Sequence, residues 1–150
     1  MFCDFYYNSN YCFEEQKQTI MNEICQQPRI RIYDSLDEIK LRNRQIENVV
    51  IIFDAFSFEL SELEEYQSFK REDYNINIDF HIHFEIHNGI EDWDKEMMAL
   101  LNYLLGEIVN DCVLEYYGNP VMVSRDGKIE IDESKTGRIV GLPFDLLNNI

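Results

Sequence analysis

The three histidines of the chain lie close together in an alternating stretch, which makes this stretch the clearest candidate for chemistry. Residues 76–87 alternate apolar and polar side chains, and this period of two predicts a strand with one polar face. The polar face would carry Asp79, His81, His83, Glu85 and His87. Successive side chains on one face of a strand are about 6.6–7 Å apart, so two of these histidines would share a metal ion only in favourable rotamers.

Two interpretations of this polar face remain open. In the first, which we adopt, it is the solvated face of an antiparallel sheet and binds no cofactor. In the second, His81, His83 and His87 bind a metal ion, and the protein is a metal-dependent enzyme. The sequence offers no second segment with ligands at metal-binding spacing. It also lacks the Gly-x-Ser-x-Gly, Gly-x-Gly-x-x-Gly and phosphate-loop motifs, so we predict a protein without catalytic residues.

The net charge of the chain indicates what kind of partner it binds. Its 29 acidic and 13 basic residues give a formal net charge of −16, and the sequence pI is about 4.4. This charge disfavours nucleic acids and anionic membranes as direct partners and favours a positively charged protein surface. Acidic residues are dense between positions 59 and 73, where a solvated helix or loop is the alternative to an interface. The residues that we predict to contact a partner are Glu59, Glu62, Glu64, Glu65, Tyr66, Glu72 and Asp73.

The order of predicted elements indicates a single α+β domain over residues 1–150. Strands are predicted at 2–7, 29–33, 49–58, 76–87, 112–117, 121–125 and 128–131. One helix, capped by Ser9 or Asn10, runs to about Gln27, and another covers 93–109. We therefore expect a mainly antiparallel sheet with two principal helices packed on one face and a C-terminal three-strand meander, closed by a hairpin turn at Asp126-Gly127.

Cysteine spacing and hydropathy indicate the cellular compartment. The four cysteines, at positions 3, 12, 25 and 112, form no Cys-x-x-Cys pair. The first residues lack the apolar region of a signal peptide, and no run approaches the roughly 18 apolar residues of a membrane span. We expect reduced thiols in the cytoplasm, with Cys25 and Cys112 as small core residues.

Residues 97–131 carry a familiar pattern. A helix ending in Leu-Leu is followed by a short break with Asp111, a strand reading Val-Leu-x-Tyr-x-Gly-Asn, and then Val-Met-Val-Ser-Arg-Asp-Gly-Lys-Ile. This pattern resembles the C-terminal half of the SitI3-type immunity proteins, which belong to bacterial polymorphic-toxin and contact-dependent growth inhibition systems. The detailed match covers roughly a quarter of the chain, and its elements are structural ones.

The resemblance implies a cytoplasmic antidote. Such a protein binds a cognate toxin domain, here the C-terminal region of a large toxin, as a monomer, and blocks its active site or a neighbouring surface. An acidic antidote suits a toxin that acts on nucleic acid, because the cleft of such a toxin is basic. The family supplies no catalytic residues to carry over. The alternative is an acidic intracellular regulatory or scaffold domain that recognises another basic protein.

Overall fold

The computed structural model of the protein describes residues 2–24, 31–34, 49–52, 56–87, 93–132 and 144–147. Its elements are β1 (Phe2–Ser9), α1 (Phe13–Ile24), β2 (Arg31–Asp34), β3 (Val49–Ile52), β4 (Phe56–Glu62), the 3-10 helix η1 (Glu65–Gln67), α3 (Lys70–Tyr74), β5 (Phe80–Ile86), α4 (Trp93–Glu107), β6 (Val109–Tyr116), β7 (Asn119–Arg125), β8 (Lys128–Ile131) and the 3-10 helix η2 (Phe144–Leu146). Cys25 lies outside the described residues. Across the described ranges, no helix has both the length and the apolar character needed to cross a membrane.

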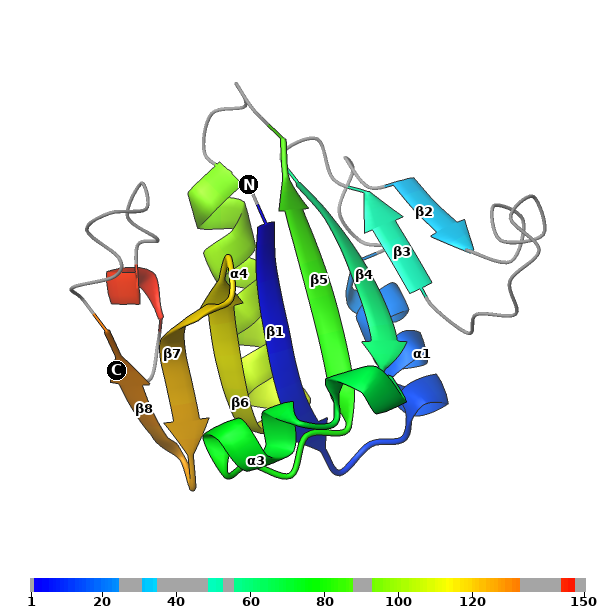
Figure 1. The fold of residues 1–150 in the computed structure, drawn as a ribbon. Coiled ribbons are helices and arrows are strands. Elements are labelled where there is room, and N and C mark those ends of the chain that lie inside the picture. The colour runs from blue at the N-terminus through cyan, green and yellow to red at the C-terminus, as the bar shows by residue number, and fades with distance from the viewer. Residues whose placement is uncertain are drawn as a thin grey trace.

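The strands of the described ranges form one eight-stranded sheet in the order β2-β3-β4-β5-β1-β6-β7-β8, and every neighbouring pair is antiparallel (Figure 1). The N-terminal strand β1 lies between β5 and β6, so it joins the two halves of the sheet. The consecutive strands β6, β7 and β8 form the expected C-terminal meander. The predicted α+β class with a mainly antiparallel sheet is therefore confirmed.

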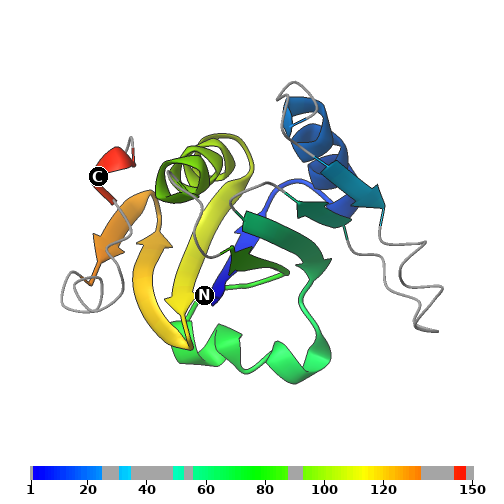
Figure 2. The same ribbon diagram turned by 90° about the horizontal axis from the view of Figure 1, so that it is seen from above.

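One face of the sheet is covered by α1 and α4 and forms the main core (Figure 2). The alternation of β5 places Phe80, Ile82, Phe84 and Ile86 in this core, as the sequence predicts. The α4 side chains Met97, Leu101 and Leu104 are fully buried against it. Their spacing of four and three residues sets them on one stripe of the helix, which is why α4 lies on the sheet rather than beside it.

The opposite face holds a second, smaller apolar cluster. Tyr6, Ile76, Ile78 and Val113 are buried together there. The sequence placed Ile76 and Ile78 on the same face as Phe80, and this was wrong. The strand begins only at Phe80, so the period of two does not extend back to residues 76–78, which pack beneath the preceding helix α3 instead.

Two other predicted boundaries are corrected. The single strand expected at 49–58 is a pair of antiparallel strands, β3 and β4, in which Val49 lies opposite Leu60. Continuous β-branched and aromatic residues mark strands but do not show where a chain reverses. The first helix begins at Phe13, later than a cap at Ser9 or Asn10 would give; the Cys12 N–H donates to Glu15 Oε1 at 3.2 Å instead.

The Asp126-Gly127 turn between β7 and β8 has positive φ at both residues, 49° and 77°, as a type I′ hairpin requires. We predict that Gly127→Ala lowers the free energy of unfolding by about 1 kcal/mol, because an L side chain is strained in this region. Gly106, exposed in α4, is the matched control, since an added Cβ there meets nothing within 4 Å. Gly106→Ala should instead raise the free energy of unfolding by about 0.5–1 kcal/mol, as measured by urea unfolding. If both variants changed this free energy in the same direction, the interpretation would be contradicted.

Candidate functional site

The sheet face opposite α1 and α4 is partly covered by η1 and α3 (Figure 2). We call residues 62–73 the acidic segment. In its first turn, the Gln67 side-chain oxygen accepts from the Glu64 N–H at 3.2 Å, as in a capping box, and the Gln67 N–H donates to the Glu64 carbonyl at 2.9 Å, the ordinary 3-10 bond. The Ser-x-x-Glu spacing of Ser61 and Glu64 is also that of a capping box, but Ser61 belongs to β4.

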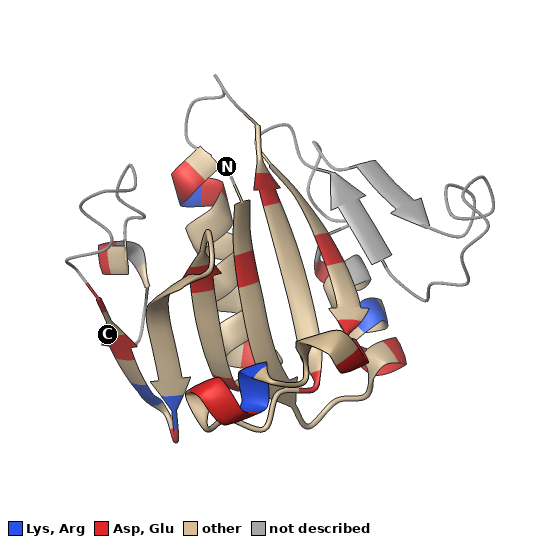
Figure 3. Cartoon of the chain, in the orientation of Figure 1, with Lys and Arg blue, Asp and Glu red and all other residues tan. Residues whose placement is uncertain are grey.

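Most of the predicted contact residues are exposed in the acidic segment. Exposed side chains there are Glu62, Glu64, Glu65, Tyr66, Glu72 and Asp73. Figure 3 marks the acidic residues along η1 and α3, together with the basic residues of α3. Glu59 is the exception, because it is partly buried on β4 and lies opposite His83 in the register of the sheet. The structure therefore groups six of the seven predicted residues and separates the seventh.

The two basic residues of the acidic segment interact with the body of the protein. Lys70 Nζ is 2.7 Å from Glu115 Oε1 on β6, and its side chain is only 16% exposed. Arg71 Nε donates to the Ile78 carbonyl at 2.6 Å, and its guanidinium is 3.7 Å from the Asp79 carboxylate. Because both cations already have acidic neighbours, the outward charge of the segment comes from its five carboxylates.

Glu115 is a buried carboxylate at the centre of a polar network. Only 2% of its side chain is exposed, and Oε1 accepts from both Lys70 and the Tyr74 hydroxyl. Burial raises the pKa of Tyr74, and the hydrogen bond to Glu115 adds to the rise. The Lys70 ammonium also lies 5.2 Å from the centre of the Tyr6 ring, a cation–π distance. This network attaches α3 to β6.

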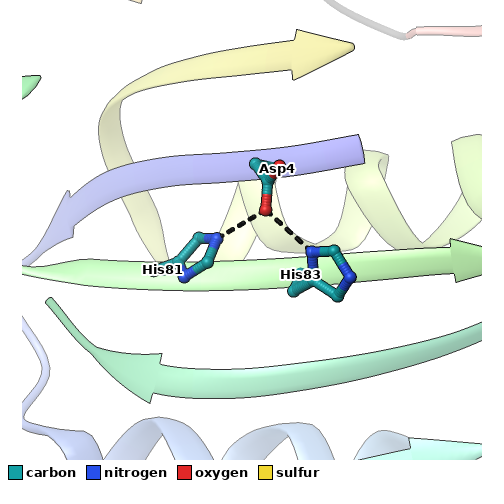
Figure 4. Close-up of side chains that lie close together, drawn as sticks. All are labelled: Asp4, His81 and His83. Carbon is teal, nitrogen blue, oxygen red and sulfur yellow. Dashed lines mark hydrogen bonds and ion pairs between the residues drawn. The ribbon is translucent and has the colours of Figure 1, made fainter. Parts of the chain in front are cut away.

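Next to this network, the structure brings Asp4, His81 and His83 together (Figure 4). Asp4 Oδ1 on β1 lies 2.8 Å from His81 Nε2 and 2.8 Å from His83 Nδ1 on β5. Antiparallel register places Asp4 opposite His83, with His81 two residues along the same face. All three side chains are partly exposed, at 23%, 13% and 38% respectively, so solvent ions reach them.

Aromatic rings fix the orientation of both imidazoles. The His81 ring stacks on Tyr6, with centroids 4.6 Å apart and planes 9° apart. The His83 ring stacks on Phe2, with centroids 5.4 Å apart and planes 25° apart. These contacts aim the two ring nitrogens at Asp4, which a strand spacing alone does not ensure.

The electrostatics of this cluster favour a negatively charged Asp4 and a positively charged His83. Burial acts to raise the pKa of Asp4, but the hydrogen bonds from His81 and His83 outweigh it and hold that pKa well below its usual range. The hydrogen bond to Asp4 raises the pKa of His83, and burial opposes the rise. The nearby Glu59 and Glu85 charges raise it further.

Gln67 contacts the far side of the His81 ring. Its Nε2 lies 3.4 Å from His81 Nδ1, and its Oε1 is occupied by the Glu64 N–H. The amide therefore presents a donor to Nδ1, which suits the tautomer that carries its proton on Nε2. This contact links the histidine cluster to the first turn of the acidic segment.

Sequence reasoning found two of the three cluster residues. His87 was expected in the set, but it follows the end of β5 and is not part of the cluster. Asp79, expected on the histidine face, lies before β5 and pairs with Arg71, while Glu85 is exposed on β5. Asp4 and Glu115 were missed, although each is a single acid within an apolar run, a pattern that indicates a partnered buried charge.

The two buried cysteines of the described ranges, Cys3 and Cys112, are unsuited to nucleophilic chemistry. Cys3, Cys12 and Cys112 are free thiols. Burial raises the pKa of Cys3 and of Cys112 to about 12, so both are protonated at neutral pH. The prediction that Cys112 is a small core residue is confirmed.

Comparison of the chain with protein-family models, with curated proteins and with solved structures found no match to any of them.

Proposed function

We propose that this protein is an immunity protein that binds and neutralises a basic toxin domain through its acidic segment. The observation that carries the proposal is a set of exposed carboxylates beside two exposed aromatic rings. Tyr66 is 73% exposed and Phe69 is 53% exposed. Aromatic side chains are enriched among the few interface residues that carry most of the binding energy, and a charged rim accelerates association and selects the partner.

The position of the two cations supports a basic partner. Lys70 is directed to Glu115 and Arg71 to Ile78 and Asp79, so a partner meets mainly carboxylates. The formal charge of −16 extends this field beyond the segment. A toxin that cleaves or modifies nucleic acid needs a basic cleft, and such a cleft is the complementary surface.

The segment is also preorganised for binding. Its first turn is capped, Ile76 and Ile78 anchor its C-terminal end in the smaller apolar cluster, and Lys70 ties its helix to β6. A surface that is ordered before binding loses less conformational entropy in the complex. This favours tight binding over a merely solvated charge run.

The resemblance at residues 97–131 supports the antidote form of the proposal over the scaffold form. These residues form α4 and the β6–β8 meander, away from the acidic segment in sequence. The antidote would act in the cytoplasm, where it meets a toxin domain encoded by a neighbouring gene. A toxin gene beside the gene for this protein would distinguish the two forms, because a scaffold domain has no reason to be encoded there.

Charge reversal tests the proposal. The variant Glu62→Lys/Glu64→Lys/Glu65→Lys/Glu72→Lys should bind the toxin domain encoded by the adjacent gene on the order of 100-fold more weakly, because attraction becomes repulsion at the interface. Binding by the unaltered protein should weaken as salt is raised, and the variant should lose or reverse this dependence because salt also screens repulsion. Affinity is measured by calorimetry, and protection by growth of cells that produce the toxin domain.

The matched control reverses four exposed acids elsewhere, as Glu14→Lys/Glu23→Lys/Glu107→Lys/Asp145→Lys, and changes the net charge equally. It should bind and protect nearly as well as the unaltered protein. Equal losses in the two variants would assign the effect to overall charge. Full protection by the segment variant would refute the proposed interface, and failure of the unaltered protein to bind or protect would refute the antidote function.

A further inference from the structure

The cluster of Asp4, His81 and His83 has the composition of a metal site. We propose that these three side chains bind one divalent transition-metal ion, with zinc as the best-suited element. The inference does not depend on the antidote function. Two imidazoles and one carboxylate form a common three-residue ligand set for zinc, which leaves the remaining position to water or to another ligand.

The distances fit such an ion. The three ligand atoms lie within 4.8 Å of one another, and each histidine nitrogen is 2.8 Å from Asp4 Oδ1. When two ligand atoms each lie about 2.1 Å from one tetrahedral zinc ion, they are about 3.4 Å from each other. This separation falls between the 2.8 Å of the hydrogen bonds and the 4.8 Å limit of the cluster. Small side-chain rotations therefore open the hydrogen-bonded cluster into a coordination site without moving either strand.

The surroundings also suit a cation. Stacking on Tyr6 and Phe2 fixes the two imidazoles, so little conformational freedom is lost on binding. Glu59, on the neighbouring strand, lies opposite His83, and Glu85 is two residues beyond His83 on the same strand. Partial exposure of all three ligands gives an ion access from solvent.

Gln67 limits the affinity of this site. A metal on His81 Nε2 leaves the ring proton on Nδ1, which then needs an acceptor, yet the Gln67 amide presents a donor there. The variant Gln67→Glu would supply a carboxylate acceptor and retain a residue suited to the capping box. We therefore expect Gln67→Glu to bind metal about 10–100-fold more tightly, the range typical of a histidine's outer hydrogen-bond partner.

The experiment uses the full chain without an affinity tag, stripped of metal and titrated with Zn²⁺ by calorimetry and with Co²⁺ by visible absorption. The unaltered protein should bind one ion, with the absorption bands of tetrahedral Co²⁺ and no sulfur-to-metal charge transfer. Asp4→Asn and His83→Gln should each weaken binding by more than about 10-fold, and His87→Gln, the matched control, should leave it unchanged.

Several results would overturn the assignment. These are an absence of saturable binding to the unaltered protein, equal losses from His87→Gln and His83→Gln, or a sulfur charge-transfer band that places the ion on a cysteine. Circular dichroism checks that each variant is folded. Because the unaltered protein and Gln67→Glu both retain every proposed ligand, the proposal stays testable even where a ligand variant fails to fold.

Discussion

Replacing Lys70 with methionine should lower the free energy of unfolding by about 3–5 kcal/mol, because it leaves a carboxylate buried without its counter-ion. Glu115 is 2% exposed, and Lys70 Nζ is 2.7 Å from its Oε1. The Tyr74 hydroxyl would remain as a hydrogen-bond donor but carries no positive charge. Urea unfolding measures the loss, and the melting temperature should fall by about 2–4 °C per kcal/mol for a chain of this size.

A double variant separates burial of a charge from loss of packing. Lys70→Met/Glu115→Gln removes both charges and keeps an acceptor for Tyr74, so it should recover most of the loss. Lys128→Met is the matched control, because Lys128 Nζ lies 3.8 Å from Glu130 Oε1 and the two side chains are 80% and 73% exposed. An exposed pair of this kind contributes about 0–1 kcal/mol. A loss for Lys70→Met as small as that for Lys128→Met would show that Glu115 obtains its stabilisation elsewhere.

Replacing Phe84 with alanine should cost about 3–5 kcal/mol, since it empties a ring-sized space in the main core. Phe84 is fully buried on β5, and its ring centroid lies 6.1 Å from that of Phe56 and 6.0 Å from that of Phe58. All three rings lie on the sheet face covered by α1 and α4. In urea unfolding, the midpoint concentration should fall, while the slope of the free energy of unfolding against urea concentration should stay unchanged.

Phe2 provides the comparison for Phe84, because it is an aromatic residue on the adjacent strand β1. It is 40% exposed and lies opposite Glu85 in the sheet. Phe2→Ala removes a partly hydrated ring and leaves no cavity, so it should cost less than about 1 kcal/mol. If the two substitutions cost the same, the helix-covered face would not be the principal core.

The elements that the sequence determined by itself are those with strong local signals. β8 was predicted with its observed boundaries, and the Asp126-Gly127 turn was predicted because this dipeptide favours positive φ at both positions. The apolar stripe of α4 and the alternation of β5 follow from periods of 3.6 and 2, which act over a few residues. The alternation gave the wrong sheet face for Ile76 and Ile78, because the chain is not a strand before Phe80 and a period of two does not predict side-chain direction there.

The candidate site itself was decided by tertiary structure. Asp4 and His83 are 79 positions apart and meet only because β1 pairs with β5, a register that no local pattern specifies. Lys70 and Glu115 are 45 positions apart and meet because α3 lies across the sheet. Composition fixed the charge of the protein, but only packing decided which carboxylates acquire a partner inside the fold and which remain on the surface to bind another protein.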